Sequence, residues 1–238
     1  MSSWNKRLLS VVVCLMFLVL LLYAGKNTAI PTGGAKADNN ASGMCVVLDP
    51  GHGGNDPGKI GINGAKEKEI NLQIAEKVKE YLEANDVKVV MTRETDEGLY
   101  DAGADNKKVQ DMKRRIALIE ETAPCVTVSI HQNSYPQESI HGAQVFYYTG
   151  SAEGKGLAER IQNSLIKRAD SENKRQVKEN GSYYLLKKTG RSIVIVECGF
   201  LSNRSEAEKL CSEEYQDRIA WAICMGIMQY LNNAGCFG

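Results

Sequence analysis

The sequence carries no net charge and little proline, and both shortages exclude classes of protein. Its 29 Lys and Arg residues balance 29 Asp and Glu residues, so the surface has no general attraction for phosphate backbones, and we expect no nucleic-acid partner. Basic clusters such as Lys113-Arg114-Arg115 are short and lie within helical patterns. Only 5 Pro accompany 22 Gly, which is too little proline for a long disordered stalk.

Paired cysteine motifs are also missing, although the chain has seven Cys. No CxxC occurs, so a zinc site built from cysteine is unsupported. Cys45, Cys125 and Cys198 lie in or beside apolar runs, where cysteine most often acts as a small core residue. We therefore expect mostly free thiols, which are typical of a weakly oxidising setting.

Only the N-terminus has a long apolar run. Lys6 and Arg7 precede residues 8–23, LLSVVVCLMFLVLLLY, which are almost wholly apolar. A basic end followed by such a run is typical of a secretory signal or of a membrane anchor with its basic end in the cytoplasm. The sequence therefore predicts a signal or membrane anchor at residues 1–25, a linker at residues 26–43 and one exported domain at residues 44–238.

Short apolar runs alternate with amphipathic stretches through that domain. The predicted strands are residues 45–48, 87–92, 125–130, 144–149 and 193–198. The predicted helices are residues 70–85, 109–122, 155–169 and 214–231. Strands that alternate with helices predict a single α/β domain, in which a largely parallel sheet of five or six strands has helices on both faces.

Two of the three histidines follow predicted strands. His52 lies in the glycine-rich loop LDPGHGGNDPG, and His131 lies in SIHQNS. Because sites in α/β sheets form at the carboxyl ends of strands, these two imidazoles can converge and bind Zn²⁺. The loop contains neither GxGxxG nor GxxxxGK(S/T), which argues against a phosphate site. We expect His141 to be an ordinary loop residue.

Carboxylates near the same strand ends are candidates for the rest of a hydrolytic site. Such zinc sites commonly use three protein ligands and an open position for water. Glu67 and Glu69 both stand just before a predicted helix, and the residues alone do not choose between them; an acidic first turn, favoured by the helix dipole, accounts for either.

Glu197 ends the apolar run SIVIVE, where a charge is costly unless it is used or paired. A carboxylate at a strand end near a metal can act as the general base for water. The structural alternative is a salt bridge to a neighbouring helix. Cys198 must face the opposite side of the strand, so we assign it to the core.

Four stretches in this order, LDPGHGGNDPG, GAKEKEINL, SIHQNS and VECGFLSN, resemble the zinc-dependent N-acetylmuramoyl-L-alanine amidases of bacterial peptidoglycan turnover. The resemblance extends over residues 46–231 and implies a mixed, mostly parallel sheet. It implies that Zn²⁺ is bound by His52, Glu67 and His131, and that the catalytic residue is Glu197. It thereby favours Glu67 over Glu69. Arg115 and Asn133 are candidate supporting residues.

The activity implied by the resemblance is hydrolysis of the amide between N-acetylmuramic acid and L-alanine in peptidoglycan. The alternatives are a zinc peptidase acting within the stem peptide and a non-catalytic cell-wall-binding protein, although binding alone does not require Glu197. The chain departs from the family at Glu120, where members often have Asn, and at Ser192, where they often have Pro.

Short anchored chains of this kind are similar to the amidases that mature the spore cortex during sporulation, where removal of peptides prepares muramic acid for lactam formation. The expected partners are peptidoglycan, the membrane through the N-terminal segment, and an activating lipoprotein. The expected location is the extracytoplasmic face of the membrane, the cell wall or the spore cortex space.

Overall fold

The computed structural model describes residues 44–233. The predicted signal or anchor at residues 1–25 and the predicted linker at residues 26–43 lie outside the described residues. Among the residues that are described, no helix is both long enough and apolar enough to cross a membrane.

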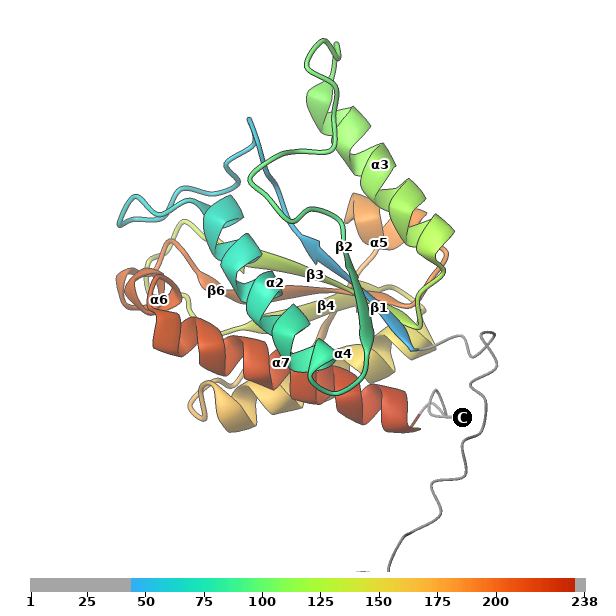
Figure 1. Ribbon diagram of the computed structural model, residues 1–238. Helices are drawn as coiled ribbons and strands as arrows, with labels where there is room; N and C mark the ends of the chain where they lie inside the picture. The colour runs from blue at the N-terminus through green and yellow to red at the C-terminus, as the bar shows by residue number, and fades with distance from the viewer. Residues whose placement is uncertain (1–43, 234–238) are drawn as a thin grey trace, which may run out of the picture. The chain divides into compact units, whose positions relative to one another are not determined.

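Six strands form one sheet in the order β2-β1-β3-β6-β4-β5 (Figure 1). Their bounds are β1 Cys45–Pro50, β2 Lys88–Met91, β3 Val126–Asn133, β4 Gln144–Tyr148, β5 Lys178–Asn180 and β6 Ile193–Phe200. Strands β2, β1, β3 and β6 are parallel neighbours, whereas β4 runs antiparallel to β6 and parallel to β5. The prediction of a mixed, mostly parallel sheet of five or six strands is confirmed.

Helices cover both faces of this sheet (Figure 1). One face is covered by α2 (Glu67–Glu83), α4 (Ala152–Arg168) and α7 (Glu213–Asn233). The other face is covered by α3 (Lys107–Thr122) and α5 (Tyr184–Lys188), and the short α6 (Arg204–Leu210) connects β6 to α7.

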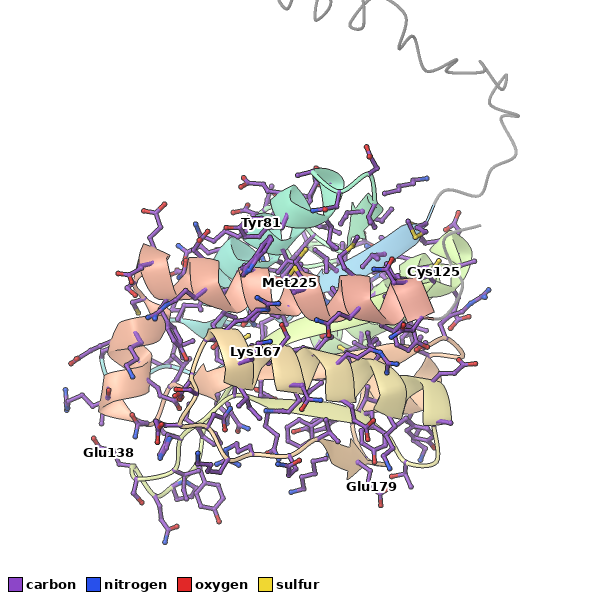
Figure 2. All side chains as sticks on the ribbon, turned by 90° about the horizontal axis from the view of Figure 1, so that it is seen from below. Tyr81, Cys125, Glu138, Lys167, Glu179 and Met225 are labelled. Carbon is purple, nitrogen blue, oxygen red and sulfur yellow. The ribbon has the colours of Figure 1, made fainter. Side chains whose placement is uncertain are left out.

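Helices α4 and α7 lie alongside each other, as Figure 2 shows. A Cβ atom at Gly226 of α7 would come 2.6 Å from the Cα atom of Ile161 in α4. Only glycine therefore allows the two helices to approach this closely at that point. The close contact helps to bury the apolar side chains beneath both helices.

The alternating residues of β6 belong to two separate cores. Val194, Val196 and Cys198 pack into the larger core beneath α2, α4 and α7. Ile193 and Ile195 pack into the smaller core on the α3 side. The assignment of Cys198 to the core is therefore confirmed. The five cysteines that the structure describes are all free, in agreement with the expectation of free thiols.

The sequence patterns missed three short elements, which are β5, α5 and α6. Strand β5 has three residues and helix α5 has five, which is too short for a periodic apolar pattern to show. Helix α6 has seven residues, and its start is marked by Asn203, whose side chain accepts a hydrogen bond from the Glu206 N–H at 2.9 Å. Helix α2 begins at Glu67, three residues earlier than predicted.

Candidate active site and metal centre

Three neighbouring parallel strands bring the candidate residues to one edge of the sheet. His52 follows the end of β1 by two residues. His131 and Glu197 are register partners near the carboxyl ends of β3 and β6. Because register partners on adjacent strands point to the same face, both side chains project on the side of the sheet that faces α3 and α5.

Helix α2 supplies the third group of the cluster. Glu67 is the first residue of α2 and is 2% exposed. Its Oε1 atom lies 3.2 Å from His52 Nε2 and 2.9 Å from His131 Nδ1. The N–H of Gln132 donates to the same oxygen at 3.1 Å, and the N–H of Lys59 donates to Oε2 at 2.7 Å. The backbone thus fixes both carboxylate oxygens.

The structure separates the two glutamates that the sequence left open. Glu69 is half exposed and pairs with Lys66, with 2.9 Å between Oε1 and Nζ. Glu67 faces the histidines instead. The difference follows from the start of α2, since residues two apart on a helix do not point the same way.

The donor set of this cluster suits zinc. One ligand atom from each of His52, Glu67 and His131 lies within 4.8 Å of the others. Two imidazoles and one carboxylate are a ligand combination of hydrolytic zinc sites. Gly51 makes room for the cluster, because a Cβ atom there would collide with the His131 ring. The residues present therefore fit a zinc ion.

The charges of the cluster shift the pKa values of its members. Burial alone would raise the pKa of Glu67, but hydrogen bonds with His131 and His52 hold it well below its usual range. Burial alone would lower the pKa of His131, but the hydrogen bond and charge of Glu67 raise it to about 8. Glu67 is therefore held as a carboxylate.

Glu197 differs from Glu67 in its hydrogen bonds and in the direction of its pKa shift. It is 8% exposed, and its buried Oε2 atom has no hydrogen-bond partner among the described residues. Burial raises its pKa to about 7, with His131 opposing and the charge of Glu67 adding to the shift. Within residues 44–233 no salt bridge joins Glu197 to a helix, so the structural alternative considered for this carboxylate lacks support.

Arg115 holds the backbone of the loop that carries His52. His52 has a φ of 65°, a left-handed conformation that is uncommon for a residue with a side chain. The Nη2 group of Arg115 donates to the His52 carbonyl at 2.6 Å, and Nη1 donates to the Pro50 carbonyl at 2.9 Å. Arg115 is 1% exposed and also pairs with Asp49, with 2.7 Å between Nη1 and Oδ1.

Two further cations hold the same loop and were not singled out from the sequence. Arg93 donates from Nη2 to the Gly51 carbonyl at 3.1 Å. Lys68 donates from Nζ to the Gly54 carbonyl at 2.9 Å. No sequence spacing connects these side chains to the loop, because they come from the segment after β2 and from the first turn of α2.

Asp56 is another contact that the sequence reasoning missed. It lies four residues after His52 in the same loop, and its Oδ2 atom is 3.0 Å from His52 Nδ1. The loop is rich in Gly and Pro and has no periodicity. The only sequence signal for this contact is that a histidine and an aspartate, which can form a hydrogen bond, lie four residues apart in the same loop.

Asn133 and His141 lie outside the cluster. The side chain of Asn133 accepts a hydrogen bond from the Ser134 N–H at 2.8 Å, and no hydrogen bond between described residues joins it to the three clustered side chains. His141 is an exposed loop residue whose carbonyl accepts a hydrogen bond from Arg175 Nε at 2.6 Å.

A cavity of about 480 Å³ opens beside the cluster. His52, His131 and Glu197 line it from the sheet edge. Other lining residues are Tyr183, Tyr184 and Leu185 around the start of α5, and Met112, Lys107 and Lys108 from α3. The cavity leaves space for a substrate next to the candidate catalytic residues.

Several known proteins are similar to this chain in sequence and in fold. The family described as N-acetylmuramoyl-L-alanine amidase matches residues 46–229. The germination-specific N-acetylmuramoyl-L-alanine amidase of Bacillus subtilis (strain 168) is 36% identical over 197 residues, which are 82% of this chain and 82% of that protein.

Two solved structures extend the comparison. The CwlD amidase from Clostridioides difficile, in complex with the GerS lipoprotein, has 39% identity and a TM-score of 0.78, covering 80% of this chain and 99% of that chain. The amidase AmiC2 of Nostoc punctiforme has 33% identity and a TM-score of 0.69, covering 79% of this chain and 97% of that chain. With a family match over nearly all of the described domain, this chain belongs to the N-acetylmuramoyl-L-alanine amidase family and is a peptidoglycan amidase.

Proposed function

We propose that this amidase depends on Zn²⁺ held by His52, Glu67 and His131, and that Glu197 is its general base. The bond cut is the amide between the lactyl group of N-acetylmuramic acid and L-alanine. One observation carries the proposal: two imidazole nitrogens converge on a single oxygen of the buried Glu67 carboxylate, at 3.2 and 2.9 Å.

Zn²⁺ bound at these residues would polarise the scissile carbonyl and lower the pKa of the attacking water to about 7. Glu197 accepts the proton of that water and later donates it to the leaving amine. Burial of this carboxyl group raises its pKa, which favours the uptake of the proton from water. Arg115 keeps His52 in place by holding its carbonyl.

We also propose a role in spore cortex maturation and a lipoprotein partner. The Bacillus subtilis relative is named as germination-specific, and the Clostridioides difficile amidase was solved with a lipoprotein. The predicted N-terminal segment would deliver the enzyme to the outer side of the membrane. A spore-forming strain that lacks this chain should then make cortex without muramic lactam; cortex with normal lactam content contradicts the role.

Metal analysis of two matched variants tests the ligand set. Purified wild-type protein should contain stoichiometric zinc by mass spectrometry. Glu67→Gln should lose zinc and activity together, because it removes a charged ligand from the cluster. Glu69→Gln, two residues away and half exposed, should keep both. A Glu67→Gln protein with full zinc content would show that the third ligand is another residue.

Muropeptide analysis tests the bond that is cut. After digestion of peptidoglycan, mass spectrometry should find muramic acid with a free lactyl carboxyl group and intact peptides that begin with L-alanine. A chelator should abolish both products, and added Zn²⁺ should restore them. Shortened peptides still attached to muramic acid would identify a stem-peptide peptidase instead.

A further inference from the structure

We propose that Asp56 is a positioning residue that fixes the ring and the tautomer of His52, so that the Nε2 lone pair of His52 is presented to the metal. The inference deepens the proposed function and rests on the metal site proposed above. Asp56 itself lies outside the cluster of three metal-binding candidates found among the described residues.

The two ring nitrogens of His52 face two different carboxylates. Nδ1 lies 3.0 Å from Oδ2 of Asp56, and Nε2 lies 3.2 Å from Oε1 of Glu67. A carboxylate only accepts hydrogen bonds, so the two carboxylates compete for the single proton of a neutral imidazole. When Nδ1 donates that proton to Asp56, Nε2 carries the lone pair on the side of the ring where a metal ion held with Glu67 and His131 would lie.

Asp56 is itself held in one orientation by the loop backbone. Its N–H donates to the Gly53 carbonyl at 3.1 Å, and its carbonyl accepts from the Gly53 N–H at 3.0 Å. Its Oδ1 atom accepts from the Gly58 N–H at 3.1 Å. One carboxylate oxygen is therefore used by the backbone, and the other is left for the imidazole.

Glu67 is the competing acceptor for the proton of the His52 ring. The side chain is 21% exposed, and the ring approaches that of His131 edge-on, with 5.0 Å between centroids. Without Asp56 at Nδ1, the proton is free to move to Nε2 and to be donated to Glu67, which leaves no lone pair for a metal at that nitrogen. Partners of this kind typically change metal affinity by 10- to 100-fold in other proteins.

Lys108 makes a second and weaker contact to the same carboxylate. Its Nζ atom lies 3.8 Å from Asp56 Oδ2, and its side chain is largely exposed. Because solvent screens such a pair, we assign Lys108 no part in choosing the tautomer.

Zinc affinity of the full-length chain tests the proposal. Asp56→Asn keeps the size of the side chain and an acceptor for Gly58, but it can place a donor opposite Nδ1. Competition with a chelating dye should give a zinc Kd about 10- to 100-fold weaker than that of the wild type. The matched control, Asp105→Asn, changes an exposed residue in the turn before α3 and should leave the Kd unchanged.

A second readout follows the His52 ring in the zinc-loaded protein. With ¹⁵N-labelled histidine, NMR should show an Nδ1–H group of wild-type His52 that exchanges slowly with solvent, because it donates to the Asp56 carboxylate. In Asp56→Asn this group should exchange faster, because the charged acceptor is gone. Asp56→Glu, which restores a carboxylate, should recover part of the slow exchange and of the zinc affinity.

The outcomes separate the two proposals. Wild-type zinc affinity in a folded Asp56→Asn variant overturns the role of Asp56 and leaves the proposed function intact. A wild-type protein that binds no zinc overturns both. If Asp56→Asn does not fold, the wild-type spectrum still decides, because rapid solvent exchange of the His52 Nδ1–H group in the zinc-loaded protein contradicts the positioning role.

Discussion

The two faces of the sheet differ in what they bury. Beneath α2, α4 and α7 lies the larger apolar core, and the polar side chains buried in these helices are mostly uncharged, as at Asn71, Gln162, Ser164 and Gln216. The face toward α3 and α5 has a much smaller apolar core, and there the sheet also buries ionic and hydroxyl groups. The buried polar residues on this side include Asp49, Thr92, Arg115, Ser129 and Glu197.

The face toward α3 differs from the other face in that it buries charged groups, which are held by hydrogen bonds. Asp49 accepts from Arg115 Nη1 and Thr92 Oγ1, both at 2.7 Å, and from Ser129 Oγ at 2.6 Å. This network is tolerated in the interior because its two charged groups, Asp49 and Arg115, are paired with each other and hydrogen-bonded. The comparison indicates that one face supplies most of the stability of the domain, while the other supplies its chemistry.

The largest expected effect is on the polar face. Glu197→Gln should lower amidase turnover about 100- to 10,000-fold, because the proton acceptor is gone. The free energy of unfolding in urea, measured with a chelator present, should be unchanged or slightly higher at pH 8. Burial raises the pKa of Glu197 to about 7, so its charged form is disfavoured in the folded state, and Gln removes that cost.

Zinc content is the control for this variant and should match that of the wild type. Near-normal turnover of Glu197→Gln would show that another group accepts the proton. A large loss of stability would show instead that Glu197 is a structural residue. The face toward α3 and α5 would then contribute to stability as well as to chemistry, contrary to the comparison drawn above.

The next effect is expected on the apolar face. Ile223→Ala in α7 removes a fully buried side chain and should lower the free energy of unfolding by roughly 2–5 kcal/mol. Turnover per folded molecule should stay close to the wild-type value. The matched change on the other side of the sheet is Ile119→Ala in α3, where the side chain is also fully buried, and it should cost less, about 2 kcal/mol, because the apolar core there is smaller. Equal losses at both sites would contradict an uneven division of stability.

The smallest expected effect is the pH dependence of the free energy of unfolding that comes from Asp49. Burial alone would raise the pKa of Asp49, but the charge of Arg115 and the hydroxyls of Ser129 and Thr92 lower it from 3.8 to about 2. The folded state thus binds this proton more weakly than the unfolded chain does. The resulting stability, roughly 2 kcal/mol, is fully present above about pH 4 and is lost as the pH falls through about 2.

Urea unfolding of the wild type and of Asp49→Asn between pH 5 and pH 2.5 measures this contribution. The wild type should be the more stable protein at pH 5, and the difference between the two should shrink as the pH falls. A difference that does not depend on pH would show that Asp49 stabilises the fold without its charge.

The long elements of the fold were predictable because their patterns are long. Five strands and four helices follow from apolar periodicity, and β6 stands out as a continuous apolar run. The family resemblance implied only that the sheet is mixed, and the antiparallel direction of β4 was not predicted, because periodicity does not encode direction. Segments β5, α5 and α6 depend on the packing of residues that are distant in sequence.

The residues of the candidate site differ in how far the sequence alone predicted them. His52 and His131 follow from their places after strands, which needs only the geometry of parallel sheets. The choice of Glu67 needed the resemblance, since the start of α2 differs from the predicted start. Asp56 was missed because a loop offers no spacing rule that would connect its side chain to the His52 ring.

Arg115 also bears on when the site can exist during folding. Its hydrogen bond to the His52 carbonyl joins residues 63 apart in the chain, and the contact of Glu67 with His131 joins residues 64 apart. Contacts over such separations close only after much of the polypeptide has collapsed, because long loops must be ordered first. A chain cut short before β6 lacks Glu197 altogether. Hydrolytic competence is therefore a late product of folding, and a partly folded chain offers scattered single ligands instead of an assembled centre.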